Sequence, residues 1–404
     1  MGQELHDPAG PGLGNLNGHA DPAAHSPRAY LRTAKAIADD VAAKHATDVD
    51  RRAVFPTQTV SALAEAGLLS AVVPRPAGGL GLDLSLIVRV ASILGRGCGS
   101  SAMIWAMHQM QLACLVRHGA LTTPTLAGLL DAIVAENLLL ASVTSEKGSG
   151  SSIHRSHAAV EPDDVGLRLH KEAPTVSYGA QAGFFLIPAR RDPQAEPEDQ
   201  VAVIVRRDQV SLQQVGGWNP MGMRGTCSPP LRIEAHFDRA QILPDPFGVV
   251  AAHTLVPLSQ ILWSAVWIGM ATEALSRAAR AVEARSSRSG TNSVDRRMAE
   301  ADQILTSLEA QLDDAVRLYH AADRGAVPRN DRFKTRMNAL KIAASTSTVQ
   351  VAQLALGMCG IAGYLEDGPL SVARMLRDLY SGQVMVSNDW LIDANAAAAV
   401  SLRR

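Results

Sequence analysis

Cysteine and net charge are both low in this sequence, and each of these features argues against a class of protein. The four cysteines, Cys98, Cys114, Cys227 and Cys359, form no C-x-x-C pair, which argues against a disulfide framework or a zinc site and suits a reducing cytoplasm. The formal net charge is −1, whereas nucleic-acid-binding proteins normally carry a basic excess. We therefore expect a cytoplasmic protein that binds neither a metal nor nucleic acid.

Long runs of uninterrupted apolar residues are also missing. The most apolar long segment, "LVPLSQILWSAVWIGMATEAL", is broken by Pro257, Gln260, Thr272 and Glu273. A membrane-spanning helix needs about 20 predominantly apolar residues, so we expect a buried helix and no membrane partner. Residues 1–27 are rich in Gly, Pro, Ala and His and contain no apolar core like that of a signal peptide, which predicts a disordered tail.

The hydrophobic pattern changes period twice along the chain. Residues 28–140 show helical spacing, as in "PTQTVSALAEAGLL", which starts at Pro56 and stops at Gly67. Residues 141–246 alternate apolar and polar positions, as in "LRIEAHFDRAQIL", which indicates strands. Helical spacing returns over 247–404, where one stripe consists of Ala301, Leu305, Leu308, Leu312 and Val316. The pattern predicts a mostly helical α+β protein: an N-terminal helical domain, a central β-barrel or sandwich, and a C-terminal helical bundle.

A loop rich in glycine and hydroxyl groups, "SVTSEKGSGSSIH" (142–154), follows the apolar run "ENLLLA". Such a loop suits an anion such as phosphate. It is not a P-loop, because its one lysine, Lys147, precedes the glycines, and it does not open a helix as a Rossmann fingerprint does. By itself the loop identifies no cofactor, since most Gly/Ser loops are connections.

Five motifs in a fixed order resemble those of the acyl-CoA dehydrogenase superfamily of flavoproteins, from about Arg28 to the C-terminus. They are "FP…LAEAGLLSAVVPRPAGGLGL", "VTSEKGSGSS", "APTVSYGAQAGFFLIPAR", "GWNPMGMRGTCSPPLRIEAHF" and "CGIAGYLEDGPLSVARMLRD". Their order over most of the chain is typical of the superfamily, though not of one reaction within it.

The resemblance implies that FAD lies against the β domain, wrapped by the 142–152 loop. Ser177 is similar to the family's flavin-contacting Thr or Ser, and Arg285 to an arginine that pairs with the pyrophosphate. Gly360 corresponds to a glycine that approaches the dinucleotide, often from a neighbouring subunit, so a homodimer or homotetramer is implied. The implied cofactor-binding residues are Ser142, Thr144, Ser145, Gly150, Ser151, Ser177, Arg285 and Gly360.

The carboxylate that the family's dehydrogenases use as a base is missing from both of its usual positions. Removing the α-proton of an acyl thioester requires such a base beside the flavin. The first position falls at Val386 or Ser387, and the second at Ser259 and Gln260. The catalytic candidates that remain are Asp389, Ser387 and His108.

Each candidate also has a purely structural interpretation. Asp389 stands where an acidic residue favours the first turn of a helix, and a lone histidine in an apolar helix, such as His108, is more often a core residue. Trp263 and Trp267 are either core residues or the wall of a substrate pocket.

Two functions stay open at this stage. The leading one is an acyl-CoA dehydrogenase-like, FAD-dependent α,β-oxidation of an acyl thioester that passes its electrons to an acceptor. The alternative is a monooxygenase of the same fold, which takes reduced FMN or FAD from a reductase and oxidises a small, for example aromatic, molecule. A flavin-free, noncatalytic relative is a third possibility that rests only on the missing base.

Overall fold

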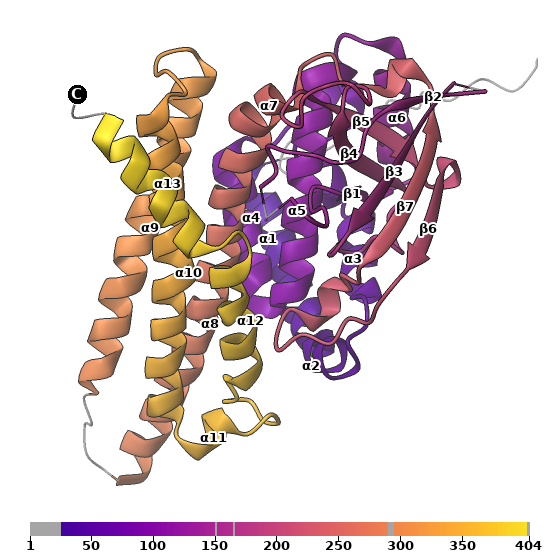
Figure 1. Ribbon diagram of the computed structural model, residues 1–404. Helices are drawn as coiled ribbons and strands as arrows, with labels where there is room; N and C mark the ends of the chain where they lie inside the picture. Colours follow the sequence, from indigo (N-terminus) through magenta and orange to yellow (C-terminus); the bar gives the residue numbers. More distant parts are fainter. Residues whose placement is uncertain (1–25, 150–151, 165, 290–294, 402–404) are drawn as a thin grey trace, which may run out of the picture.

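The computed structural model describes residues 26–149, 152–164, 166–289 and 295–401 (Figure 1). The tail predicted at 1–27 lies outside this part except for its last two residues, and Gly150 and Ser151 also lie outside it. The described residues form helices, then strands, then helices, so the predicted fold class is confirmed. The elements change near residues 140 and 247, and we keep these as the proposed domain limits.

The N-terminal part is helical. Asp83 caps the helix that follows it by accepting a hydrogen bond from the Leu86 N–H at 2.8 Å, and the helix predicted to stop at Gly67 ends where this glycine adopts a φ of 68°. The helices are α1 (Pro27–Ile37), α2 (Ala43–Arg52), α3 (Thr57–Glu65), α4 (Leu84–Gly97), α5 (Gly99–Leu115) and α6 (Pro124–Ala135). Helix α5 is buried almost all round, as its nearly continuous apolar sequence predicts.

The central part contains two separate sheets. The inner sheet has the order β1–β4–β5, and the outer sheet has the order β2–β3–β7–β6. Strands β1 and β4 pair in parallel, and the other named strand pairs are antiparallel in the described residues. The strands are β1 (Leu140–Ser142), β2 (Glu161–Asp163), β3 (Gly166–Ala173), β4 (Phe184–Arg190), β5 (Gln200–Arg206), β6 (Val210–Gln214) and β7 (Leu231–Phe237).

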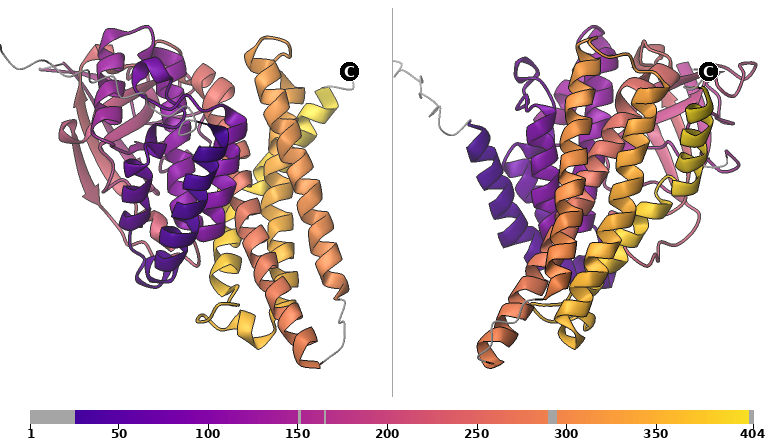
Figure 2. Two further views of the ribbon diagram at one scale, coloured as in Figure 1. Left: turned by 180° about the vertical axis from the view of Figure 1, so that it is seen from behind. Right: turned by 90° about the vertical axis from the view of Figure 1, so that its left-hand side faces the viewer.

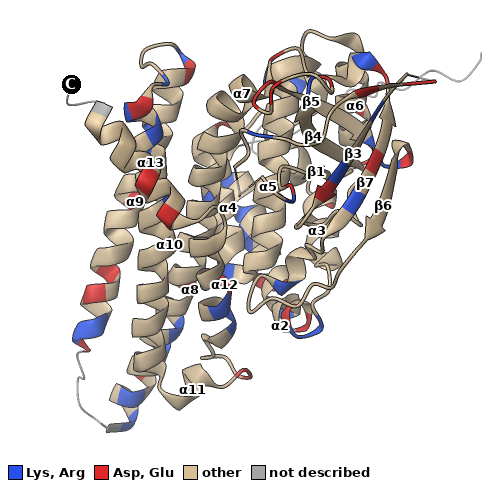
Figure 3. Cartoon of the chain, viewed as in Figure 1, with Lys and Arg blue, Asp and Glu red and all other residues tan. Residues whose placement is uncertain are grey.

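Burial along the strands shows how the sheets are layered. Strands β4 and β5 are buried along nearly their whole length, whereas β7 alternates buried and exposed residues and carries charges of both signs on its outer face with β3 (Figure 3). The inner sheet is therefore covered on both faces, and the outer sheet meets solvent on one. In the described residues the two sheets form a sandwich and do not close into a barrel.

The C-terminal part is a bundle that packs against the N-terminal helices (Figure 2). Its helices are α7 (Phe247–Val250), α8 (Val256–Ser289), α9 (Arg296–Asp323), α10 (Asp331–Cys359), α11 (Ile361–Tyr364), α12 (Ala373–Val384) and α13 (Asn388–Ser401). Helices α4 and α8 cross closely because Gly269 has no side chain: a Cβ there would lie 2.0 Å from the Ser92 carbonyl oxygen. The stripe predicted on 301–316 is buried.

Candidate active site

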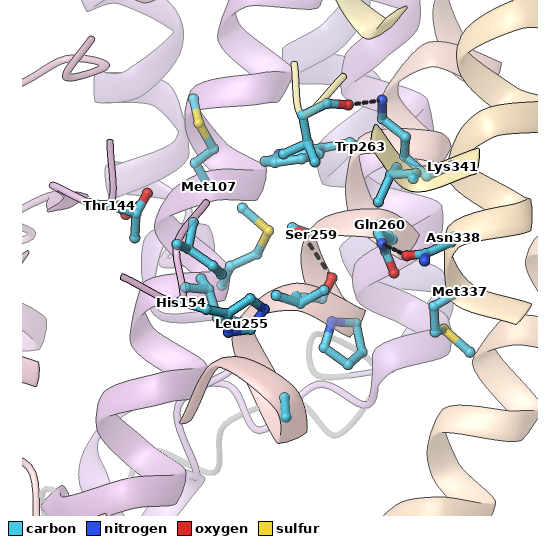
Figure 4. Close-up of a pocket in the computed structure, with 18 of the residues that line it drawn as sticks. Met107, Thr144, His154, Leu255, Ser259, Gln260, Trp263, Met337, Asn338 and Lys341 are labelled. Atoms are coloured by element: carbon cyan, nitrogen blue, oxygen red, sulfur yellow. Dashed lines mark hydrogen bonds between the residues drawn. The ribbon is translucent and has the colours of Figure 1, made fainter. Parts of the chain in front are cut away.

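A cavity of about 550 Å³ lies between the β domain, α5, α8, α10 and the start of α13 (Figure 4). One side, the hydroxyl wall, consists of Ser142, Thr144, Ser145, Thr175 and Ser177. The apolar part of the lining, which we call the apolar wall, consists of Met107, Met110, Leu255, Val256, Trp263, Phe333, Met337, Val386, Trp390 and Leu391. This size and the combination of an apolar lining with a few polar groups are typical of small-molecule and cofactor sites.

The hydroxyl wall joins two loops that leave the β domain side by side. Ser145 Oγ donates to the Thr175 carbonyl oxygen at 2.7 Å and accepts from the Thr175 N–H at 3.3 Å. Ser177 Oγ accepts from Ser228 Oγ at 2.9 Å. The wall therefore presents short side chains held in place by their own hydrogen bonds, and it leaves room for a flat ring to approach the backbone.

A buried ion pair that the sequence analysis missed anchors the loop behind this wall. The Glu146 carboxylate lies 3.3 Å from Lys171 Nζ, and their side chains are 5% and 1% exposed. Glu146 also accepts hydrogen bonds from Ser156 Oγ and from the N–H groups of His157 and Ala158. Burial opposes the charge of Glu146, but Lys171 and these hydrogen bonds outweigh it and lower the pKa of the carboxyl; burial lowers the pKa of Lys171 to about 8.

Several buried polar atoms of the cavity lack a partner in the described part of the chain. They are Gln111 Oε1, Gln260 Oε1 and Trp263 Nε1. The other end of Gln260 is fixed, because its Nε2 donates to Asn338 Oδ1 at 2.6 Å. Since an unpaired buried polar atom costs about 1–3 kcal/mol, these groups fit a cavity built to receive a polar ligand.

Both positions where the family places its base lie on this cavity. Ser259 and Gln260 reach it from α8, and Val386 reaches it from the turn before α13. Among the described residues that line the cavity there is no Asp or Glu; its charged or basic groups are His154, Lys334 and Lys341. The positions that the resemblance assigns to the base therefore border the cavity, and the residues described there are not carboxylates.

The two candidate residues near the start of α13 stand outside the cavity. Asp389 is an exposed residue in the first turn of this helix, and Ser387 accepts a hydrogen bond from the Leu391 N–H through its carbonyl oxygen. Neither contributes to the cavity lining, whereas their neighbours Val386, Trp390 and Leu391 do. The helical turn points the carboxylate of Asp389 toward solvent, so we do not propose it as a base.

His108 is a core residue that joins α5 to two other segments. Its Nδ1 accepts a hydrogen bond from the Leu140 N–H at 3.0 Å, and its Nε2 lies 3.0 Å from the Leu69 carbonyl oxygen. Both contacts are satisfied by a neutral ring protonated on Nε2. Burial lowers the pKa of His108 to about 4. His108 does not line the cavity, so the structure supports its structural interpretation.

This arrangement predicts an acid-sensitive contribution to stability. The folded pKa of His108 is about 4, below the ordinary value of about 6.5 for an unfolded histidine. As the pH falls from about 6.5 to 4, the unfolded chain binds a proton that the folded chain does not, so the free energy of unfolding should drop by about 3 kcal/mol. The stabilisation is fully present above pH 6.5. In His108→Gln this part of the pH dependence should vanish. The prediction is contradicted if the free energy of unfolding, measured with urea at pH 7 and at pH 4.5, falls by the same amount in the variant and in the wild type.

Arg285 and Gly360, the other two cofactor candidates in the described residues, lie near each other and away from the cavity. Arg285 Nη1 donates to the Met358 carbonyl oxygen at 2.6 Å, and Gly360 follows with a φ of 62°. Arg285 is separated from Trp263 by most of α8, roughly 33 Å at 1.5 Å per residue. The hydroxyls of Ser142, Thr144, Ser145 and Ser177 are thus brought together around the cavity. Arg285 and Gly360 form a second group beside α11, at the end of the bundle where Figure 1 shows that helix.

Comparisons with known proteins agree with this architecture. Residues 25–122 match the family model "Acyl-CoA dehydrogenase, N-terminal domain", and residues 248–385 match "Acyl-CoA dehydrogenase, C-terminal domain". Among curated relatives, the amino sugar nitrososynthase DnmZ of Streptomyces peucetius is 26% identical over 373 residues, covering 88% of this chain and 89% of DnmZ. The probable acyl-CoA dehydrogenase fadE25 of Mycobacterium leprae is 26% identical over 367 residues, covering 87% and 89%.

Solved structures show the same fold. FMN-bound TdsC of Paenibacillus sp. A11-2, a dibenzothiophene monooxygenase, superposes with a TM-score of 0.77 at 18% sequence identity, covering 91% of this chain and 96% of TdsC.

Proposed function

The chain belongs to the acyl-CoA dehydrogenase family, and from that premise we propose that it is a flavin-dependent oxidoreductase whose cofactor rests against the hydroxyl wall. The residues present fit such a group: the wall offers short hydroxyl side chains, and unpaired polar atoms of Gln111, Gln260 and Trp263 face the same space. A bound flavin accepts a hydride from a substrate or, when reduced, activates O₂. The chain's part is to orient the ring and to exclude water with the apolar wall.

The described cavity lining contains no carboxylate, and this observation favours one of the two reactions that the sequence left open. Abstraction of an α-proton from an acyl thioester requires a positioned base, and the two positions that supply it in the family hold Val386 and Ser259–Gln260 here. Oxidation of a small molecule by O₂ and a reduced flavin requires no such carboxylate. We therefore favour a monooxygenase that receives reduced FMN or FAD from a reductase, and its likeness to a nitrososynthase supports this choice.

Acyl-thioester dehydrogenation remains the second candidate, because the family models and the relative fadE25 favour it. Under this proposal the electrons pass to a separate acceptor, and a group other than a carboxylate takes the α-proton.

One experiment separates the two candidates. We expect the purified protein to bind FAD or FMN, to show no anaerobic bleaching of that flavin with a panel of acyl-CoA thioesters, and to consume O₂ when a flavin reductase and NADH are present with a small-molecule substrate. Anaerobic bleaching by an acyl thioester would instead establish the dehydrogenase. A protein that binds neither flavin would refute both.

We also propose that the enzyme is a homodimer or homotetramer. One extended dinucleotide cannot readily reach the hydroxyl wall and Arg285 of the same chain, so Arg285 and Gly360 would serve a cofactor held by a second copy. Exposed apolar side chains surround that end of the bundle: Ile361, Tyr364 and Leu365. The four unpaired cysteines support the expected cytoplasmic location.

A further inference from the structure

Lys341 is a buried cation on the cavity, and none of the described carboxylates forms an ion pair with it. It lies on α10 and is 1% exposed. Its Nζ donates to the Val386 carbonyl oxygen at 2.5 Å and to Asn388 Oδ1 at 2.7 Å, and both acceptors are uncharged. Burial lowers the pKa of Lys341 to about 8 and is the one cause resolved for this shift, so no described acidic group compensates its charge. A buried ammonium without a counter-ion is costly unless a partner arrives.

The surrounding residues hold this ammonium in one orientation. Asn388 Nδ2 donates to Ser345 Oγ at 3.0 Å, which turns the amide oxygen of Asn388 toward Lys341. Val386 has a φ of 57°, an outlier for a β-branched residue, and this strained turn presents its carbonyl oxygen to the lysine. Strain of this kind concentrates at functional sites.

The geometry leaves one donor for a ligand. An ammonium has three N–H bonds, and two of those of Lys341 are engaged by Val386 and Asn388. Lys341 lines the same cavity as Trp263 and Thr144, and it stands across the cavity from the hydroxyl wall (Figure 4). A group bound at Lys341 would therefore place the rest of a small molecule along the apolar wall, toward the proposed flavin.

We propose that Lys341 binds a carboxylate of the substrate, so that the enzyme acts on a small carboxylic acid with an apolar body; this rests on the proposed function. One singly charged carboxylate matches one ammonium that has one N–H not engaged by Val386 or Asn388. Charge-assisted hydrogen bonds of this type are among the stronger ones in proteins. The apolar wall, with Met107, Trp263 and Met337, accommodates the uncharged part.

The test compares acids with their neutral amides. Phenylacetate and phenylacetamide, and hexanoate and hexanamide, are titrated into the full-length protein at pH 7, and binding is followed by calorimetry and by the fluorescence of Trp263 and Trp390, which line the cavity. We expect each acid to bind at least tenfold more tightly than its amide. Lys341→Met should weaken binding of the acids by about 10–100-fold and leave the amides within about threefold, since loss of a charge-assisted bond is worth one to two factors of ten.

Lys334→Met is the matched control, because Lys334 also borders the cavity but is exposed to solvent. This variant should keep the preference for acids. Should Lys341→Met fail to fold, Lys341→Gln tests the same loss of charge while keeping a donor for Val386.

The proposal is overturned if the wild-type protein shows no preference for acids over amides, or if the Lys341 variants retain it. These measurements do not depend on flavin. A protein that binds the acids through Lys341 but no FMN or FAD would refute the proposed function alone, and a flavoprotein indifferent to the acid group would refute the role of Lys341 alone.

Discussion

Glu146→Gln is expected to lower the free energy of unfolding by about 3–5 kcal/mol, because it leaves Lys171 buried without its counter-ion. The lysine side chain is 1% exposed, and its other contact is the Pro188 carbonyl oxygen at 2.6 Å, which cannot neutralise its charge. Glutamine has nearly the same shape as glutamate, so the change removes charge with little change in volume. Urea unfolding followed by circular dichroism measures the difference.

The matched control for Glu146→Gln is a substitution at the next residue, Lys147. Lys147 pairs with Glu172 at 3.3 Å, but these side chains are 79% and 36% exposed, and a surface pair contributes at most about 1 kcal/mol. Lys147→Met should therefore stay within about 1 kcal/mol of wild type. If Glu146→Gln cost no more than this control, the buried pair would not anchor the loop.

The same substitution should act on the cofactor, since Glu146 is one residue from Ser145 of the hydroxyl wall. Three hydrogen bonds from residues 156–158 converge on the carboxylate, so its loss frees the loop that the resemblance assigns to the flavin. Under the proposed function, flavin affinity should fall in Glu146→Gln and stay unchanged in Lys147→Met, as measured by flavin fluorescence quenching.

Arg377→Met is expected to lower the free energy of unfolding by about 3 kcal/mol or more. The substitution breaks the contacts that join α12 to α2 and to the β domain, a junction that we call the seam. Arg377 donates to the Asp50 carboxylate at 2.6 and 3.1 Å and to the Met221 carbonyl oxygen at 3.0 Å. Asp50 is 7% exposed and Arg377 26%. The variant strands a buried carboxylate on α2, and removal of one partner of a buried pair is strongly destabilising.

An exposed ion pair of Arg51, the neighbour of Asp50 on α2, is the control for Arg377→Met. Arg51 contacts Asp367 at 2.7 Å, with side chains 48% and 78% exposed, so Arg51→Met should change the unfolding free energy by less than about 1 kcal/mol. Thermal and urea unfolding of both variants measure these two changes in the free energy of unfolding. Similar losses for the two arginines would show that Asp50 does not depend on Arg377.

The seam also includes residues of the motif "GMRGT". Arg224, in "GMRGT", donates to the Asp50 carbonyl oxygen at 2.8 Å, and the Met223 N–H donates to Asp378 at 2.6 Å. Burial raises the pKa of Asp378 to about 6. These residues therefore hold the β domain between α2 and α12, and they do not line the cavity.

The hydrophobic pattern predicted correctly the features that depend only on the residues within one helix or strand. The helix of 301–316 buries the stripe that its spacing predicts, and β7 alternates as its sequence does. The pattern did not distinguish a barrel from a sandwich, because closure depends on which distant strands pair. Ser145 and Ser177 were placed near one cavity by the family's motifs, whereas Asp389 and His108 were proposed from their distance along the chain or from their residue type alone.

The sequence by itself determined the order of the elements, the family and the absence of a carboxylate at two positions, since period, motif and residue identity are properties of the chain. Only the tertiary structure decided that Val386 and Gln260 line one cavity, that His108 joins backbone groups, and that Lys341 and Lys171 are buried cations. Among the described residues, Lys171 has a carboxylate counter-ion and Lys341 has none. The physical reason is that a side chain's solvation and partners are supplied by segments distant in sequence. A lysine in "ALKIAAS" has the same covalent chemistry whether it faces water or a closed cavity, and folding alone makes the difference.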